Sequence, residues 1–463
     1  MATTKLPDGP QTHPLLQLYQ WIVRPLEFLD TCAERYGDCF SLKLANYPTF
    51  VFFSNPQAIE KIFTANPKQF DVGKANRILR PTLGDNSLLM LDGDRHQRQR
   101  QLLMPSFHGE RMRTYGHLID QITKQVTAQW QEGQPFTVRP FMQDISLQVI
   151  LEAVFGLHEG QRYQQLKQLL ASLLDLTSSR LGFALAIFSA LEHDLGPWSP
   201  GGYFIRKRQE IDQLIYAEIH QRREQPNPSG SDILSLMMAA RDEAGQPMTD
   251  QELRDELMTL LVAGHETTAT SLTWALYWIH RLPEVKEKLL EELDTLGNDP
   301  DPSTIARLPY LNAVCSETLR IYPVVIITVP RIVKSPLHFM GYDFEPEVML
   351  TPCIYLTHHR EDLYPQPKQF KPERFLERQF SPYEYLPFGG GNRRCIGAAF
   401  ALFEMKLALV SILSSCQLAL ADNRPVYPKR RGVTMAPAGG VQMVMTGRRQ
   451  DKERSPQAVA SSV

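Results

Sequence analysis

The sequence predicts a mainly α-helical protein with a smaller β part. Between about Asp92 and Leu290, apolar residues recur at spacings of three and four, which is the period of a helix with one buried face. Two shorter regions, near the N-terminus and after residue 323, are rich in β-branched and aromatic residues and contain turn residues, as strands do. A chain of 463 residues, 43% hydrophobic and 22% charged, is typical of a globular protein with one large or two moderate domains.

The predicted β part begins with a hairpin over residues 38–53, which the turn-forming sequence Asn46-Tyr47-Pro48 divides into two strands. Short strands and turns are also expected in residues 324–333 and 340–350. We therefore place the β part mainly in residues 38–54 and 324–350, and expect residues 1–446 to form a single domain whose remainder is helical. Residues 447–463 are charged and then rich in Ser and Ala, which predicts a disordered tail.

The longest predicted helix starts at a capping box, Thr249-Asp-Gln-Glu252, in which the two end residues satisfy each other's backbone N–H groups. Its pattern continues to about His280, and a helix of roughly 30 residues in a globular protein is expected to be central and buried. The other helices are predicted over residues 58–65, 115–130, 142–155, 163–174, 202–223, 311–321 and 396–414.

Charge and cysteine content exclude several classes of protein. The net charge is −2, without blocks of like charge, so no attraction to nucleic acid or to an anionic membrane is expected. Six cysteines without a CxxC pair disfavour a disulfide scaffold and favour a reducing compartment. Neither a secretory signal nor an apolar run of the roughly 20 residues that span a bilayer is visible. These observations predict a soluble, cytoplasmic protein without a transmembrane anchor, and we expect a monomer.

The segment from Phe388 to Gly397 reads FGGGNRRCIG and places Cys395 between a glycine-rich loop and a predicted helix. A thiolate is favoured there by the positive end of the helix and by backbone N–H groups that the glycines leave free. Gly397 lets the backbone approach a flat cofactor, and Arg393 can face an anionic edge of that cofactor. Taken alone, a glycine-rich turn with a buried structural cysteine explains the segment better than a cofactor site does, and a phosphate loop is disfavoured because no Gly-Lys-Ser/Thr follows.

Four motifs in the C-terminal half together resemble those of the cytochrome P450 superfamily. Phe388, Gly391, Arg393, Cys395 and Gly397 match its haem-binding pattern FxxGxRxCxG. The ExxR, PERF and oxygen-groove motifs are matched by Glu317-Thr-Leu-Arg320, Pro372-Glu-Arg-Phe375 and Ala263-Gly-His-Glu-Thr-Thr268. All four occur in the family's order and spacing, so the chain is identified as a member, similar to cyanobacterial enzymes related to fatty-acid hydroxylases. The resemblance implies the cytochrome P450 fold, with the haem between the long central helix and the cysteine loop.

The resemblance also assigns roles to individual residues. Cys395 is expected to be the iron ligand of haem b, in a loop that an ion network of Glu317, Arg320 and Arg374 holds. A catalytic acid/base role for Glu317 is the less favoured alternative. The haem propionates are assigned to His96, which stands where many relatives have Trp, and to three arginines. The complete set of expected haem-binding residues is His96, Arg100, Arg331, Phe388, Arg393, Cys395 and Gly397.

Glu266 and Thr267 interrupt an otherwise apolar stretch of the long helix, which is unexpected unless polar groups serve a function there. The Thr267 hydroxyl can donate to the carbonyl of Ala263, four residues earlier, and so open a small groove beside Gly264. By resemblance, Thr267 and Glu266 are the catalytic residues that deliver protons during oxygen activation. A buried helix contact rich in Ser and Thr is the alternative.

The expected reaction is insertion of one oxygen atom of O2 into a small apolar substrate: a fatty acid, an alkane or a terpenoid. By resemblance, the pocket is lined by residues 72–91, 173–195, 262–263, 325–328 and Met435. Arg77 or Arg80 could anchor a carboxylate at the pocket mouth, although an exposed loop arginine explains either one better.

A separate ferredoxin or flavodoxin, with its reductase, is expected to donate the electrons, because no redox domain is visible in the sequence. We expect a basic patch for an acidic donor, formed by Arg95, Arg98, Arg111 and Arg394. Two alternatives remain open: a haem-thiolate isomerase or peroxygenase, and a non-catalytic haem sensor.

Overall fold

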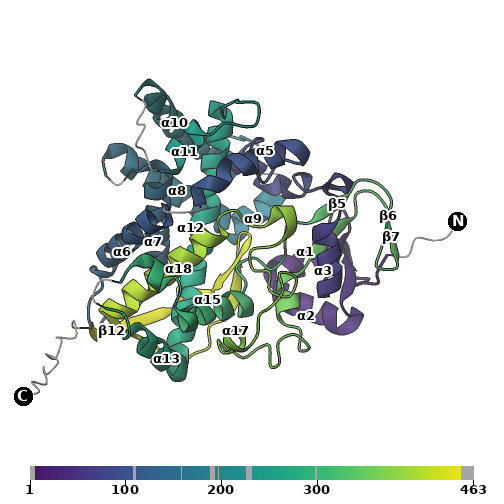
Figure 1. Cartoon of the computed structure of the whole chain (residues 1–463). Helices are drawn as coiled ribbons and strands as arrows, with labels where there is room; N and C mark the ends of the chain where they lie inside the picture. The colour runs from purple at the N-terminus through teal and green to yellow at the C-terminus, as the bar shows by residue number, and fades with distance from the viewer. Residues whose placement is uncertain are drawn as a thin grey trace, which may run out of the picture.

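A computed structural model of the chain describes residues 6–107, 111–157, 159–187, 193–196, 198–225, 232–297 and 300–449. Helices dominate it, and the β part is divided: β6 (Leu337–Phe339) and β7 (Tyr342–Phe344) lie on one side with the N-terminal helices, and β12 (Gln442–Arg448) lies on the opposite side (Figure 1). The helices are α1 (Pro14–Val23), α2 (Pro25–Tyr36), α3 (Pro56–Thr64), α4 (Arg80–Leu83), α5 (Gly93–Leu103), α6 (Arg111–Thr127), α7 (Val138–Phe155), α8 (Gln161–Ser178), α9 (Arg180–Ile187), α10 (Pro200–Glu224), α11 (Ile233–Ala239), α12 (Asp250–Arg281), α13 (Pro283–Leu293), α14 (Pro302–Ile305), α15 (Pro309–Ile321), α16 (Ile354–His358), α17 (Arg374–Glu377) and α18 (Ala398–Ser415).

Helix α12 is the centre of the helical part, and most of its residues are buried. The capping box is present at its start: Glu252 N–H donates to the Thr249 hydroxyl at 3.2 Å, and Thr249 N–H donates to the Glu252 carboxylate at 2.8 Å. The helix packs along α7 and also contacts α10, α15 and α18. The expected central helix is therefore present with both predicted ends correct to within a residue or two.

Helix α18, which follows the cysteine loop, is long and apolar enough to cross a membrane by length and composition alone, the one such helix among the described residues. Two-thirds of it (67%) is buried inside the protein, and it packs against α6, α12 and α15. Its apolar character is therefore explained by its position in the core.

The strands are β1 (Cys39–Leu42), β2 (Phe50–Phe53), β3 (Phe70–Asp71), β4 (Pro135–Thr137), β5 (Arg331–Val333), β6 (Leu337–Phe339), β7 (Tyr342–Phe344), β8 (Met349–Pro352), β9 (Cys416–Leu420), β10 (Pro428–Arg431), β11 (Thr434–Pro437) and β12 (Gln442–Arg448). The largest sheet has the order β1-β2-β8-β5-β3, with β1 and β2 forming the expected hairpin. Three smaller sheets pair β4-β12-β9, β10-β11 and β6-β7.

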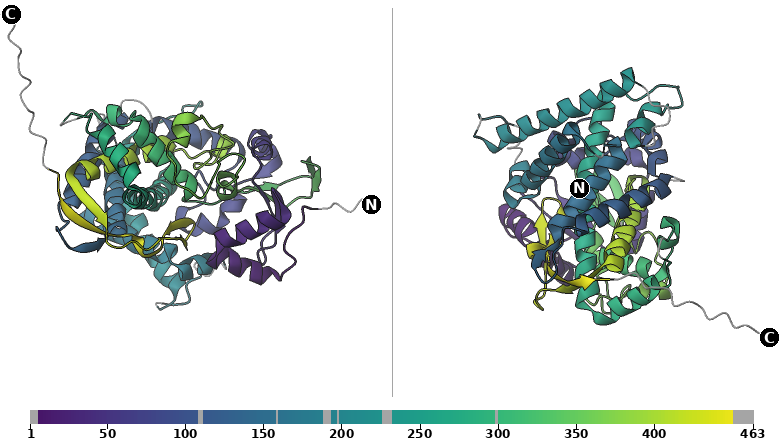
Figure 2. Two further views of the ribbon diagram at one scale, coloured as in Figure 1. Left: turned by 90° about the horizontal axis from the view of Figure 1, so that it is seen from below. Right: turned by 90° about the vertical axis from the view of Figure 1, so that its left-hand side faces the viewer.

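A third β region at the C-terminus corrects the prediction, which placed strands mainly in 38–54 and 324–350. Strand β9 follows α18 directly, without turn residues that would mark where the helix ends and a strand begins. The β10–β11 hairpin begins at Pro428 and ends at Pro437, and proline is disfavoured inside sheets, so its sequence does not indicate strands. Strand β12 also reaches Arg448, two residues into the predicted tail, while residues 450–463 lie outside the described part. In the view from below, the yellow C-terminal strands extend toward the purple N-terminal helices (Figure 2).

A buried ion network connects α15 to the irregular chain that precedes the cysteine loop. Arg320 Nε lies 2.7 Å from one Glu317 carboxylate oxygen, and Arg374 Nε lies 3.3 Å from the other. Glu317 and Arg320 are completely buried, and the Arg374 side chain is 9% exposed. Both guanidinium groups also donate to backbone carbonyls of the adjoining chain, among them those of His358, Pro365 and Pro367. The three residues predicted as a structural network thus lie together.

Replacing Glu317 by Ala would leave two buried guanidinium groups without their carboxylate. We expect the free energy of unfolding to fall by about 3–5 kcal/mol, because an orphaned buried charge is much more costly than a missing surface pair. Urea denaturation followed by circular dichroism measures the change.

The matched control is Lys288→Ala, which removes the surface ion pair between Lys288 Nζ and Glu373, 2.7 Å apart. Solvent screens that pair, so its loss should leave the urea midpoint nearly unchanged. Equal destabilisation by the two substitutions would contradict a structural role for the Glu317 network.

Candidate functional site

An apolar cavity of about 510 Å3 lies between α12 and the glycine-rich loop that contains Cys395. Helix α12 contributes Ala263, Gly264, Thr267 and Thr268 to one wall, and the loop 387–397 contributes the opposite wall. Of the six cysteines, all of which lie in the described part of the chain, Cys395 alone lines this cavity. The expected arrangement of helix, space and cysteine is therefore present.

The loop around Cys395 is shaped by its own backbone. Cys395 N–H donates to the Phe388 carbonyl at 2.9 Å, which closes the loop into a tight turn. Gly389 and Gly391 have φ of 65° and 64°, a left-handed conformation that favours glycine. A Cβ at Gly390 would lie only 2.2 Å from the Phe63 ring, so the loop can pack on α3 only with glycine there.

Electrostatics around the Cys395 thiol act in opposite directions. Burial raises the pKa of the thiol, while the N–H of Gly397 and the positive charges of Arg100 and Arg394 oppose that rise. A bound metal cation would add to the second effect and favour the thiolate. Apart from its chain neighbours, no residue of the described chain comes within 4 Å of the position that a Cβ on Gly397 would take, so a flat group can approach the backbone beside the sulfur.

Four cationic or protonatable side chains line one end of the cavity: His96 and Arg100 from α5, Arg331 from β5, and Arg393. Burial and the three neighbouring arginines lower the pKa of His96 to about 3. Burial likewise lowers the pKa values of Arg331 and Arg393 to about 10. Positive charges crowded in this way disfavour one another, and an anionic group bound between them would relieve the repulsion.

One carboxylate, that of Asp92, belongs to this cluster. It accepts a hydrogen bond from Arg393 Nη2 at 2.5 Å. It also accepts hydrogen bonds from the backbone N–H groups of Val72, at 3.0 Å, and Gly73, at 2.8 Å. Arg393 Nε is buried and has no partner among the described residues. The cluster therefore keeps cationic capacity for a further anion. A haem with two propionates requires three features that this cavity has. They are a cysteine opposite an apolar helix, space beside the backbone of Gly397, and a cationic end.

The groove residues on α12 divide between two sides of the helix. Thr267 lines the cavity, and its hydroxyl donates to the Ala263 carbonyl at 2.6 Å, as predicted. Gly264 leaves room for α7, because a Cβ there would come 3.0 Å from Ile150 Cδ1. The Ser146 hydroxyl of α7 donates to the Gly264 carbonyl at 3.3 Å.

Glu266 does not line the cavity, contrary to the placement that the motif suggested. Its carboxylate forms an ion pair with Arg139 of α7 and accepts a hydrogen bond from Gln143 at 3.1 Å. Glu266 lies about 100° around the helix from Thr267, on the side away from Thr268, and this direction places it against α7. The motif fixes only the order of the two residues in the chain. Packing of α12 against α7 decides the direction in which the Glu266 side chain points.

The wall of the cavity agrees in part with the predicted segments. Residues from 75–79, 88–89, 183–187 and 325–328, with Ala263, line it as expected, while Val262 and Met435 do not. The predicted segments do not include the N-terminal region, and from the last hairpin they include Met435 in place of Arg430 and Val433. No local pattern marks these residues as pocket residues: Leu18, Trp21, Leu44, Tyr47, Phe50, Arg430 and Val433.

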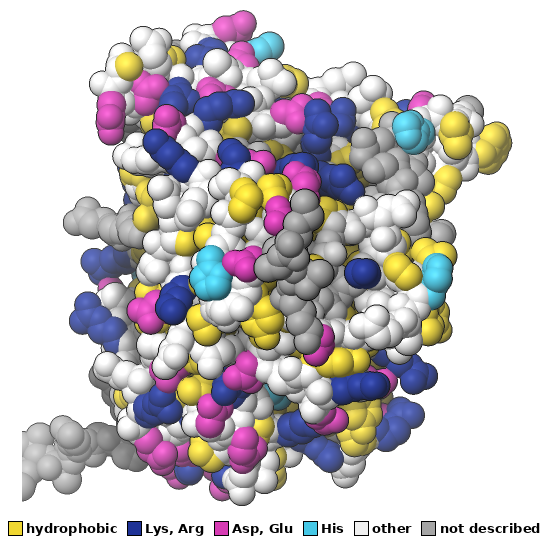
Figure 3. All heavy atoms as spheres, turned by 90° about the vertical axis from the view of Figure 1, so that its right-hand side faces the viewer, with side chains coloured by type: hydrophobic (Ala, Val, Ile, Leu, Met, Phe, Trp, Pro, Cys, Tyr) yellow, Lys and Arg dark blue, Asp and Glu magenta, His cyan; other side chains and the backbone are white. Residues whose placement is uncertain are grey.

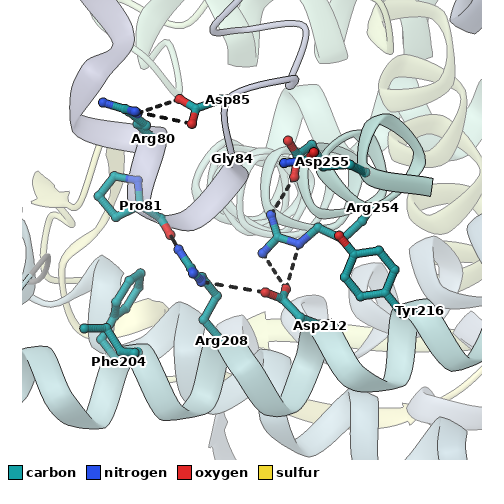
Figure 4. A pocket seen from close by; sticks show the side chains of 12 residues that line it. Arg80, Pro81, Gly84, Asp85, Phe204, Arg208, Asp212, Tyr216, Arg254 and Asp255 are labelled. Carbon is teal, nitrogen blue, oxygen red and sulfur yellow. Dashed lines mark hydrogen bonds and ion pairs between the residues drawn. The ribbon is translucent and has the colours of Figure 1, made fainter. Parts of the chain in front are cut away.

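The two arginines considered as carboxylate anchors lie elsewhere. Arg77 stacks over the Tyr47 ring, with its guanidinium carbon 5.0 Å from the ring centroid, and is not part of the cavity wall. Arg80 pairs with Asp85 at 2.6 Å in a second cavity between α4, α10 and the start of α12 (Figure 4). That cavity has the same volume, about 510 Å3, but its charged side chains largely pair with one another, as Arg254 does with Asp212 and Asp255.

The predicted basic patch for an electron donor is weaker than expected. Arg98 is held by Asp242 at 2.6 Å and Glu252 at 2.9 Å, so its charge is largely neutralised. Arg95 and Arg394 remain exposed. Elsewhere, the face shown in Figure 3 carries Lys and Arg side chains interspersed with Asp and Glu, so that face does not present a single sign of charge.

Comparisons with known proteins agree over nearly the whole chain. The family model of cytochrome P450 matches residues 7–443. Cytochrome P450 135B1 of Mycobacterium tuberculosis is 39% identical over 458 residues, which are 98% of this chain and 94% of that protein. Cytochrome P450 138 of Mycobacterium bovis is 33% identical and covers 96% of this chain, with 97% of its own length matched.

Solved structures show the same fold. The retinoic-acid-bound cyanobacterial CYP120A1 has a TM-score of 0.82 and 25% identity, and the match covers 96% of this chain and 100% of that one. The heme domain of cytochrome P450DA has a TM-score of 0.83 at 24% identity, covering 97% and 99% of the two chains. The cavity with its cysteine, the cationic end and these similarities lead to one conclusion: the chain belongs to the cytochrome P450 family of haem-thiolate monooxygenases.

Proposed function

We propose that this cytochrome P450 hydroxylates a fatty acid, an alkane or a terpenoid, and that a separate ferredoxin or flavodoxin with its reductase supplies the electrons. The observation that carries the proposal is the lining of the cavity that ends at Cys395. Away from the cationic end, it consists mainly of aliphatic and aromatic side chains, such as those of Ile78, Leu79, Phe183 and Ile187. An apolar substrate gains free energy by leaving water for such a wall.

Similar proteins support the substrate class. CYP120A1, with 25% identity, was solved with retinoic acid bound, and retinoic acid is an apolar isoprenoid chain with one carboxylate. We also propose that the protein is a cytoplasmic monomer.

The bound haem would supply oxygen activation, and a thiolate ligand favours cleavage of the O–O bond more strongly than a histidine ligand. The chain's own residues would hold the haem in place and supply protons for the reaction. Cys395 would provide the thiolate. His96, Arg100, Arg331 and Arg393 would hold the propionates at the cationic end of the cavity.

Thr267 would hold a proton at its Oγ atom beside the groove. In the structure, its hydroxyl donates a hydrogen bond to the Ala263 carbonyl. Rotation of the hydroxyl would allow it to donate instead to an acceptor in the cavity. Glu266 stays in the proposal as a proton donor from behind the groove. Because Arg139 holds its carboxylate, delivery requires Glu266 to leave that ion pair first.

The thiolate assignment is tested by spectroscopy of the reduced holoprotein under carbon monoxide. We expect the red-shifted Soret band of a thiolate-ligated haem, because Cys395 is the cavity cysteine. Cys395→His should abolish that band. The control is Cys39→Ser, which changes a cysteine of β1 outside the cavity and should preserve it. A histidine-type band in the unsubstituted protein would disprove the assignment.

Proton delivery is tested by Thr267→Ala. We expect about ten-fold or more loss of product per reductant consumed, with release of hydrogen peroxide, because the groove loses its hydroxyl. The matched control is Thr273→Ala, since the Thr273 hydroxyl makes the same back hydrogen bond, to Ala269 at 2.6 Å, but does not line the cavity. Unchanged coupling in Thr267→Ala, or equal uncoupling in both variants, would count against the assignment.

Turnover distinguishes the proposed monooxygenase from an isomerase, a peroxygenase and a sensor. Fatty acids and terpenoids that change the haem spin state are incubated with NADPH, ferredoxin, its reductase and isotope-labelled O2. We expect products that carry one labelled oxygen atom. Product formation without reductant would favour an isomerase or, with added peroxide, a peroxygenase. Ligand binding without any product would favour a sensor.

A further inference from the structure

Arg430 is a buried cation in the wall of the apolar cavity. It lies in β10, opposite Met435 of β11, and is 6% exposed. Its guanidinium carbon is 4.9 Å from the centroid of the Trp21 ring and 5.4 Å from that of the Phe183 ring. Segments from both ends and the middle of the chain thus meet around one charged group.

The hydrogen-bonding edge of this guanidinium has no partner. Nε and Nη2 of Arg430 are both enclosed, and neither finds an acceptor among the described residues. These two atoms form the side-on fork with which an arginine binds both oxygens of a carboxylate. Arg320 uses the same pair of atoms on Glu317, at 2.7 and 2.9 Å, and Arg360 uses it on Asp362, at 2.9 and 2.8 Å.

The other fully buried arginines of the described chain each donate to at least one acceptor of the protein, although Nε of Arg139 also lacks one. Arg139, Arg254 and Arg374 each pair with a carboxylate, and Arg331 donates to the Val329 carbonyl at 2.6 Å. An unpaired buried charge is costly to the folded protein, so it is retained where a ligand completes it. Burial lowers the pKa of Arg430 to about 10, still far above neutral pH, so the group remains charged.

The hairpin that carries Arg430 is held in place by the irregular segment after α15 and by α12. Met435 N–H donates to the Val324 carbonyl at 2.8 Å, and Trp274 Nε1 donates to the Met435 carbonyl at 3.0 Å. Val433, at the tip of the hairpin, lines the cavity and is 44% exposed, so the hairpin lies where the cavity meets solvent. Arg430 is separate from the cationic end, because it lies on β10 beside Trp21 and Phe183, whereas the residues of the cationic end come from α5, β5 and the cysteine loop.

We propose that Arg430 binds the carboxylate of an amphipathic substrate, which makes a long-chain or terpenoid acid the preferred substrate class. This inference rests on the proposed monooxygenase function and narrows it. The guanidinium carbon lies over two aromatic rings, and rotation of the side chain would turn its enclosed N–H fork to the carboxylate in a place shielded from water, where an ion pair is strong. The apolar body of the acid then extends through the cavity toward Cys395.

The first test uses ligands that report binding without turnover: ω-imidazolyl alkanoic acids of graded chain length and their methyl esters. Their imidazole binds the haem iron and shifts the Soret band, whatever the natural substrate is. With a chain of matching length, the holoprotein should bind the acid about 10- to 100-fold more tightly than the ester, the range expected for a charged hydrogen-bonded pair.

Arg430→Met should remove this preference by lowering the affinity for the acid, while the affinity for the ester stays the same. Arg430→Lys should retain part of it, because the charge remains but the fork is lost. Arg77→Met is the matched control and should preserve the preference, since Arg77 is outside the cavity wall. Equal binding of acid and ester at every chain length, or a preference that Arg77→Met abolishes and Arg430→Met does not, would overturn the proposal.

The second test measures stability of the ligand-free holoprotein. Arg430→Met removes an unpaired buried charge and keeps the apolar volume, so the thermal midpoint should rise, whereas Arg320→Met should lower it. A fall with Arg430→Met would show a structural role and overturn the proposal. Failure of the proposed function gives a different result. In that case the protein would form no oxygenated product, while its preference for acids would still depend on Arg430.

Discussion

The Glu317 carboxylate, enclosed between the guanidinium groups of Arg320 and Arg374, is the interaction on which the position of the cysteine loop depends. The chain between α17 and α18 has little regular structure, so few ladder hydrogen bonds can hold it. The buried charges replace such a ladder, because each guanidinium reaches backbone carbonyls that no helix or strand satisfies. A complete network is stable, whereas a network that lacks one member leaves an uncompensated charge. Cys395 is therefore placed by electrostatics as much as by packing.

Buried positive charge serves two purposes in this protein. Where a carboxylate of the chain completes it, as at Arg254 and Arg374, it connects distant segments. Where the chain leaves it incomplete, it faces the apolar cavity, at the cationic end around Arg393 and at Arg430. The second arrangement lowers the stability of the ligand-free protein and gives binding energy and direction to an anionic group. A ligand with one anionic end would lie in one orientation, and orientation decides which carbon meets the reactive centre.

Helix α12 separates the two halves of the chemistry. Its cavity side carries the small and hydroxylic residues of the groove, and its α7 side carries Glu266 in an ion pair with Arg139. Packing along α7 holds both sides in register, and Gly264 permits the close approach. In the proposed relay, a proton from Glu266 would cross from one side of the helix to the other to reach Thr267, which would make the Arg139 ion pair a control point for delivery.

The sequence alone determined the fold class, the central helix, the first hairpin and the identity of Cys395, because those depend on periodicity, caps and motif spacing within short stretches. It missed the C-terminal strands, whose pairing is with β4 and with one another and whose local pattern is weak. The tertiary structure decided which way Glu266 points, which arginines are neutralised by carboxylates and which line the cavity. Arg430 is unremarkable in the sequence, because burial and lack of a partner arise only when Trp21, Phe183 and the last hairpin meet.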